Sequence, residues 1–164
     1  MGWDKKSYLF SHSSQISQEN TAFLEKVKAK AGLNDLYEAR DLSEVVFRVM
    51  RDLMTTEAAD RVASELTEEA QPTDDKTLQS EISTLWKDTN PIVAWLSRVR
   101  PPLIFDDQAF IFRIEQEGGV PQGMSGETIV AAVFGATKDE LSQQRIQEIS
   151  EFMPGKVKEI WQKA

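Results

Sequence analysis

The fold is decided by residues 36–54, which read LYEARDLSEVVFRVMRDLM. Apolar residues recur here at helical spacing and form a band wider than the single stripe of a surface helix. The members of this band are Leu42, Val45, Val46, Phe47, Val49, Met50 and Leu53. The stretch therefore predicts a buried central helix over about Leu36–Met54, against which neighbouring helices pack.

The same pattern returns in the second half of the chain, where residues 129–136 take the place of the central helix. A shift of 87 positions without gaps aligns Phe23 with Phe110, Val27 with Ile114, Gly32 with Gly119, Leu42 with Ile129, Val46-Phe47 with Val133-Phe134, Asp52 with Asp139, Val62 with Ile149 and Leu66 with Met153. A shift of 75 then aligns Ile82, Leu85 and Trp86 with Val157, Ile160 and Trp161, so the first copy has 12 extra residues. We therefore predict an all-α fold of two tandem related helical-bundle units, a pseudo-repeat, packed into one compact domain.

Composition and proline positions divide the chain further. Residues 1–17 are polar and serine-rich, and Asn90-Pro91 reads as a stop and restart of the helical pattern. We expect an N-terminal arm over residues 1–22, a first unit over 23–90, a connector helix with a proline-rich link over 91–109, and a second unit over 110–164.

The net charge of the chain limits the kinds of partner that it can bind. The chain carries 19 Lys and Arg against 27 Asp and Glu, a net charge of −8, which disfavours nucleic acid as a partner. Eight acids fall between Asp52 and Asp75 with only Arg61 among them. This run predicts a solvated acidic helix face or, alternatively, a dock for a basic partner. No apolar run is long enough to span a membrane.

Few residues are available for catalysis. The chain has no cysteine, which removes thiolate chemistry and cysteine metal sites, and its one histidine, His12, lies in the serine-rich arm. A catalytic base has to be held in place, and such an arm does not hold it. We therefore expect a protein that is not an enzyme, has no cofactor or metal, and works in the cytoplasm, where disulfides are rare.

Trp86 and Trp161 recur at matching places and each closes an amphipathic helix. Both residues could line a ligand cage, but aromatic side chains in this pattern more often fill a core. We expect core positions for both.

Two surfaces are candidates for binding an unknown protein partner, and a homodimer is kept open. The first combines an aromatic and two basic side chains before a rigid proline pair, namely Trp95, Arg98 and Arg100. Trp and Arg are favoured anchors of interfaces. The alternative is a connector that only joins the units. The second surface is acidic and consists of Glu65, Glu68 and Glu69.

A glycine-rich loop suggests a different function, a small-molecule or anion site between the two units. Its residues are Gly118, Gly119, Gly123, Ser125 and Gly126. A phosphate-binding loop would follow a strand and end on Lys-Ser or Lys-Thr, and this loop does neither. A turn between helices that needs positive φ explains the glycines without a ligand. The anion site is kept as the alternative.

Several segments follow the pattern of a known family. They are Phe23–Val27, Ala39–Leu53 and Met54–Leu66 in the first copy, and Leu141–Ile146, Phe152–Gly155 and Trp161 in the second. In these segments the chain resembles domain-of-unknown-function family 2267, a bacterial family. The chain departs from the family pattern at Thr67, where a proline would stand, and in the insert before Trp86. The resemblance implies a small all-α protein of paired helical units, and it brings no activity or catalytic residue.

Overall fold

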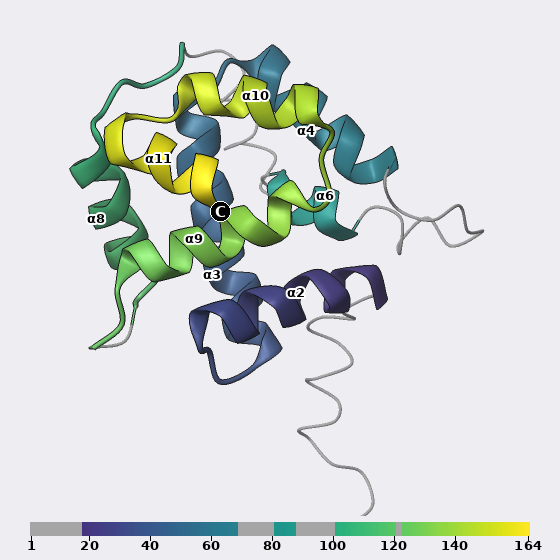
Figure 1. The fold of residues 1–164 in the computed structure, drawn as a ribbon, viewed down its shortest axis with the longest axis vertical. Coiled ribbons are helices and arrows are strands. Elements are labelled where there is room, and N and C mark those ends of the chain that lie inside the picture. The colour runs from purple at the N-terminus through teal and green to yellow at the C-terminus, as the bar shows by residue number, and fades with distance from the viewer. Residues whose placement is uncertain (1–17, 69–80, 88–100, 121–122) are drawn as a thin grey trace, which may run out of the picture.

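The computed structural model describes residues 18–68, 81–87, 101–120 and 123–164, and all regular secondary structure in these ranges is α-helix (Figure 1). The helices are α2 Gln18–Ala31, α3 Leu36–Leu53, α4 Thr56–Glu68, α6 Glu81–Trp86, α8 Asp107–Glu117, α9 Gly126–Lys138, α10 Gln143–Phe152 and α11 Gly155–Lys163. The all-α prediction is confirmed. The predicted N-terminal arm up to residue 17 and the predicted connector helix after Pro91, up to residue 100, lie outside the described residues.

Short polar side chains fix where the helices begin. Asp35 accepts a hydrogen bond from the backbone N–H of Glu38 at 2.8 Å and starts α3, so this helix begins where the sequence predicts. Thr55 and Ser142 act in the same way, because their hydroxyl oxygens accept from backbone N–H groups in the first turns of α4 and α10. Ser125 caps α9, because its hydroxyl oxygen accepts from the backbone N–H of Glu127.

Two glycines end helices in the left-handed backbone region. Gly32 follows α2 with φ of +71°, and Gly119 follows α8 with φ of +58°. Residues with a side chain rarely adopt this conformation. Gly32 closes the end of α2, since its N–H donates to the carbonyl of Lys28 at 2.9 Å.

We expect Gly32→Ala and Gly119→Ala each to lower the free energy of unfolding by about 1 kcal/mol, because alanine is strained at positive φ. A Cβ at either position meets no atom within 4 Å, so the cost comes from the backbone alone. Urea denaturation of the two variants measures it. Unchanged stability in both variants would show that these turns relax to negative φ.

One core receives side chains from both halves of the chain. Helices α3 and α9 are its most buried elements, and residues such as Val46, Phe47, Val133 and Phe134 are fully buried. Helix α2 contacts α9 as well as α3, and α8 contacts α3 as well as α9. Helices α4 and α10 lie side by side at the opposite end of the molecule from α2 (Figure 1). Helices far apart in sequence therefore share the same core.

A first aromatic set consists of Phe23, Phe47 and Trp86, all buried. The Phe47 ring centroid lies 5.2 Å from that of Trp86 in an edge-on arrangement and 6.1 Å from that of Phe23. The indole Nε1–H of Trp86 donates to the carbonyl of Ala59 at 3.0 Å. This tryptophan fills the core, as predicted, and its one polar atom is satisfied.

A second aromatic set consists of Phe110, Phe134 and Trp161, also buried. Phe134 lies 4.9 Å from Trp161, again edge-on, and 6.3 Å from Phe110. The indole Nε1–H of Trp161 donates to the carbonyl of Ile146 at 2.9 Å. The core position predicted for Trp161 is therefore confirmed as well.

Candidate functional site

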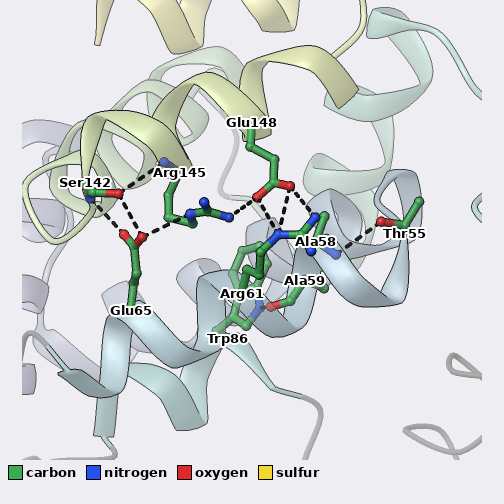
Figure 2. Close-up of polar contacts among 9 residues, drawn as sticks. All are labelled: Thr55, Ala58, Ala59, Arg61, Glu65, Trp86, Ser142, Arg145 and Glu148. Atoms are coloured by element: carbon green, nitrogen blue, oxygen red, sulfur yellow. Dashed lines mark hydrogen bonds and ion pairs between the residues drawn. The ribbon is translucent and has the colours of Figure 1, made fainter.

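A group of charged side chains lies where α4 meets α10. It consists of Arg61 and Glu65 on α4, and of Ser142, Arg145 and Glu148 at and after the start of α10 (Figure 2). Figure 2 shows these side chains converging between the two helices, and we call them the α4–α10 charge cluster.

Glu148 lies between the two arginines. The Nε–H of Arg61 is shared between the two carboxylate oxygens of Glu148, at 3.2 and 3.0 Å, and Nη2 of Arg61 donates to one of them. From the other side, Nη1 of Arg145 donates to Oε1 of Glu148. The carboxylate of Glu148 thus joins the two helices through charge-assisted hydrogen bonds, which are stronger than neutral ones.

Glu65 holds the start of α10. Its carboxylate accepts from the backbone N–H of Ser142 and from the Ser142 hydroxyl, both at 2.8 Å. Nε of Arg145 lies 3.0 Å from Oε2 of Glu65, close enough for an ion pair but without hydrogen-bond alignment. Glu65 therefore connects the end of α4 to the first turn of α10.

The cluster is only partly open to solvent. The side chain of Arg145 is 8% exposed and those of Glu65 and Glu148 are 21% and 19% exposed, whereas that of Arg61 is 50% exposed. Hydrogen bonds from Arg61 lower the pKa of Glu148, and hydrogen bonds to Glu148 raise the pKa of Arg61. Both shifts favour the charged forms of Arg61 and Glu148, so this pair is charged at neutral pH.

The cluster is built to hold two helices together. The Ser142 hydroxyl donates to Glu65 and accepts from the N–H of Arg145, so it serves as a helix cap. Both carboxylates face arginines. Among the described residues, no group of three or more His, Cys, Asp or Glu side chains is placed to hold a metal ion.

The stability supplied by Glu148 should depend on pH. Its pKa is lowered in the folded state, so its contribution is present above the ordinary value of 4.5 and is lost as pH falls below it. We expect Glu148→Gln to destabilise the protein at pH 7, and we expect the difference from wild type to shrink between pH 4.5 and pH 3. Urea denaturation across this range measures it, and a difference that does not vary with pH would contradict the pKa shift.

The sequence-predicted partner residues fall into two groups. Trp95, Arg98, Arg100 and Glu69 lie outside the described residues, as does the side chain of Glu68 at the end of α4. Glu65 is described, and its carboxylate is already engaged by Ser142 and Arg145. A partner that bound Glu65 would have to displace these contacts, and the partner role of this surface stays a prediction.

The predicted anion loop has its helix N-terminus already satisfied. The N–H of Gly126 donates to the carboxylate of Glu115 at 3.1 Å, and the N–H of Glu127 donates to Oγ of Ser125. The next two N–H groups donate to the carbonyl of Ser125. Gly119 and Gly123 have positive φ, at +58° and +92°, whereas Gly118 is at −82°. These contacts weigh against the anion site, which stays a prediction.

A group of apolar side chains at the start of the second half is exposed, and the sequence pattern does not predict it. Ile104 is 98% exposed, Phe112 is 60% exposed and Leu103 is 39% exposed. We call these three the exposed apolar residues. The exposure of Phe112 could have been predicted from the internal repeat, because a shift of 87 aligns Phe112 with Glu25, a charged residue that is exposed on α2.

The backbone around these residues is anchored. The N–H of Leu103 donates to the carbonyl of Asp52 at the end of α3, at 2.7 Å. The guanidinium of Arg113 lies 5.3 Å from the ring centre of Phe105 and 2.9 Å from the carboxylate of Asp52. Ile104 therefore lies in a segment fixed on both sides, although its own side chain projects into solvent.

The chain was compared with curated proteins and with protein families. No curated protein matches the chain. None of the helices in the described ranges is both long and apolar enough to cross a membrane. The model of a family described as uncharacterized conserved protein (DUF2267) matches residues 20–160, which is most of the chain. The chain therefore belongs to the DUF2267 family.

Proposed function

We propose that the protein is a non-enzymatic interaction module of the cytoplasm that binds another protein through its exposed apolar residues, Leu103, Ile104 and Phe112. The observation that carries the proposal is the 98% exposure of Ile104 on an anchored segment. The other large apolar side chains of the described residues are buried or partly buried. Exposed apolar side chains that form one patch are typical of a binding site.

Leu103 and Ile104 lie next in sequence to a predicted candidate for partner binding. They directly follow the segment from Trp95 to Pro102, whose aromatic and basic side chains predict either a contact site or a connector that only joins the units. Interfaces combine an apolar centre with such anchors. Closeness in sequence therefore makes Trp95, Arg98 and Arg100 candidates for the same interface as Leu103 and Ile104.

The net charge of the chain favours a different protein, and not a second copy of this chain, as the binding partner. Each chain carries a net charge of −8, so two copies repel each other, whereas a neutral or basic partner is not repelled. We therefore propose a partner that is not acidic overall and that offers an apolar pocket for Ile104.

The test is capture from the native host with tagged chains, followed by mass spectrometry. The informative variant is Ile104→Ser/Phe112→Ser, and the matched control is Gln144→Ser/Gln147→Ser, which alters two exposed positions on α10. We expect one or more proteins to be retained by wild type and control, and retention by the first variant to fall roughly tenfold, as for interface anchors. Thermal unfolding should show that both variants remain folded.

Two results would contradict this proposal. If no retained protein depends on Ile104 and Phe112, the exposed apolar residues are not a partner site. If light scattering shows a wild-type dimer that Ile104→Ser/Phe112→Ser dissociates, the surface serves a second copy instead.

We also infer that the chain consists of two related helical units packed about an approximate twofold axis. The two aromatic sets support this inference, because Phe23, Phe47 and Trp86 align with Phe110, Phe134 and Trp161, and the two sets have similar ring contacts. The hydrogen bonds of the two indole N–H groups also occupy equivalent positions. Ala59, the acceptor for Trp86, aligns at a shift of 87 with Ile146, the acceptor for Trp161.

Ion pairs between the two halves are reciprocal. Lys26 pairs with Asp139 at 3.1 Å, and Arg113 pairs with Asp52 at 2.9 Å. A shift of 87 aligns Lys26 with Arg113 and Asp52 with Asp139. When residue i of one unit contacts residue j of the other and the converse also holds, a twofold relation is expected. The matched contacts of α2 with α9 and of α8 with α3 support the same inference.

A further inference from the structure

Equivalent residues of two units meet each other only close to a twofold axis. Arg61 and Glu148 are equivalent at the shift of 87, and they are paired directly in the α4–α10 charge cluster. This inference rests on the two-unit arrangement inferred above. In that arrangement the axis passes between α4 and α10 at the Arg61–Glu148 pair, and the two equivalent positions there carry opposite charges.

Because the two equivalent positions carry opposite charges, a contact between a first and a second unit differs from a contact between two copies of the same unit. Two first units packed in the same way would place Arg61 against a second Arg61, and two second units would place Glu148 against a second Glu148. Like charges in contact repel, and this repulsion disfavours both arrangements. Only the pairing of a first unit with a second unit gives attraction at the axis.

The ion pair between Arg145 and Glu65 also disfavours the pairing of like units. Arg145, whose side chain is 8% exposed, faces Glu65 of the other unit. At the shift of 87 the position of Glu65 corresponds to Phe152, so pairing two second units would leave Arg145 without this carboxylate. A buried charge that loses its partner is costly.

We propose that the α4–α10 charge cluster selects the unlike unit as the packing partner, so that each chain folds on itself and does not pair its units with the like units of a second copy. Buried ion pairs are often neutral for stability, and their best-attested role is to specify which arrangement forms. The cluster fits this role because its charges balance only when the two different units meet.

The test uses two full-length variants that each place like charges at the axis. Arg61→Glu makes both axis positions acidic, and Glu148→Arg makes both basic. In a mixture, the two chains can exchange units, and the resulting heterodimer restores an acidic residue opposite a basic one in both of its seams. The variants are unfolded in urea, mixed one to one with one chain isotope-labelled, refolded and weighed by native mass spectrometry.

The matched control is Lys156→Glu mixed with Glu127→Arg. These residues form an ion pair at 2.8 Å within the second half of the chain, and the substitutions change net charge by the same amounts. Exchange of units cannot help this pair, because both residues remain on the same unit. The control therefore separates attraction at the axis from general attraction between oppositely altered chains.

We expect the axis mixture to form heterodimer at a level roughly tenfold above either homodimer and above the control mixture, because two repulsive contacts become attractive. Wild type should remain monomeric under the same treatment. If either variant alone does not fold, mixing should restore its helical circular dichroism signal. The proposal is overturned by a mixture that shows no excess of heterodimer over the control, or that fails to restore folding. Capture of a partner through Ile104 and Phe112 is a separate measurement, so its outcome does not depend on this one.

Discussion

Trp161→Ala should lower the free energy of unfolding by about 3–5 kcal/mol, the usual cost of truncating a large buried aromatic residue. Trp161 is fully buried, packs edge-on against Phe134, and donates its indole N–H to the carbonyl of Ile146. The substitution leaves a cavity and removes the hydrogen bond from the indole to the carbonyl of Ile146. Urea denaturation followed by circular dichroism measures the loss.

Trp86→Ala and Phe112→Ala are the matched comparisons. Trp86 has the same environment in the first half of the chain, so its loss should be of similar size and should appear in a single transition, because one core contains both residues. Phe112 is 60% exposed, so its truncation should change stability by about 0.5 kcal/mol or less. A loss at Trp161 no larger than that at Phe112 would contradict the packing described above.

Arg145→Met should destabilise the protein by about 2–3 kcal/mol, less than the full cost of breaking a buried ion pair because the two carboxylates keep some contact with water. Methionine retains most of the side-chain volume, so the loss reflects charge. The substitution removes the guanidinium that lies between the carboxylates of Glu65 and Glu148. Urea denaturation at pH 7 measures the change.

Arg61→Met provides the comparison on the other side of Glu148. Arg61 is half exposed, and water can replace much of what it supplies, so we expect a clearly smaller loss than at Arg145. As pH falls below 4.5 and Glu148 becomes protonated, the cost of Arg145→Met should shrink. Equal losses for the two variants, or a loss at Arg145 that persists unchanged in acid, would show that the cluster does not act through charge.

Much of the fold could be predicted because local chemistry determines it. The wide apolar band of residues 36–54 predicts the buried helix α3, and the polar residues Thr55, Ser125 and Ser142 mark where three further helices begin. Gly32 and Gly119 mark where two helices end, because the backbone there needs positive φ. Apolar periodicity identifies the buried face of a helix, but it does not identify the helix that covers that face. The contact of α2 with α9 therefore had to come from the structure.

The charged and exposed features were harder to predict. Glu65 lies in an acidic run with only Arg61 in opposition, so the sequence placed it on a partner surface. Its basic partner, Arg145, is supplied by α10, far away in the chain. Ile104 lies in a non-helical segment, where periodicity gives no information about burial. Both cases depend on long-range contacts that a single sequence does not specify.

An aromatic nuclear Overhauser spectrum of the full-length protein tests the two-unit arrangement most directly. If two related units are packed together, the indole protons of Trp86 show contacts to Phe47, and those of Trp161 show contacts to Phe134, with similar intensities. Assignment by the Trp86→Phe and Trp161→Phe variants separates the two sets of signals. An indole that contacts the phenylalanine of the other set, or that contacts neither, would contradict the arrangement.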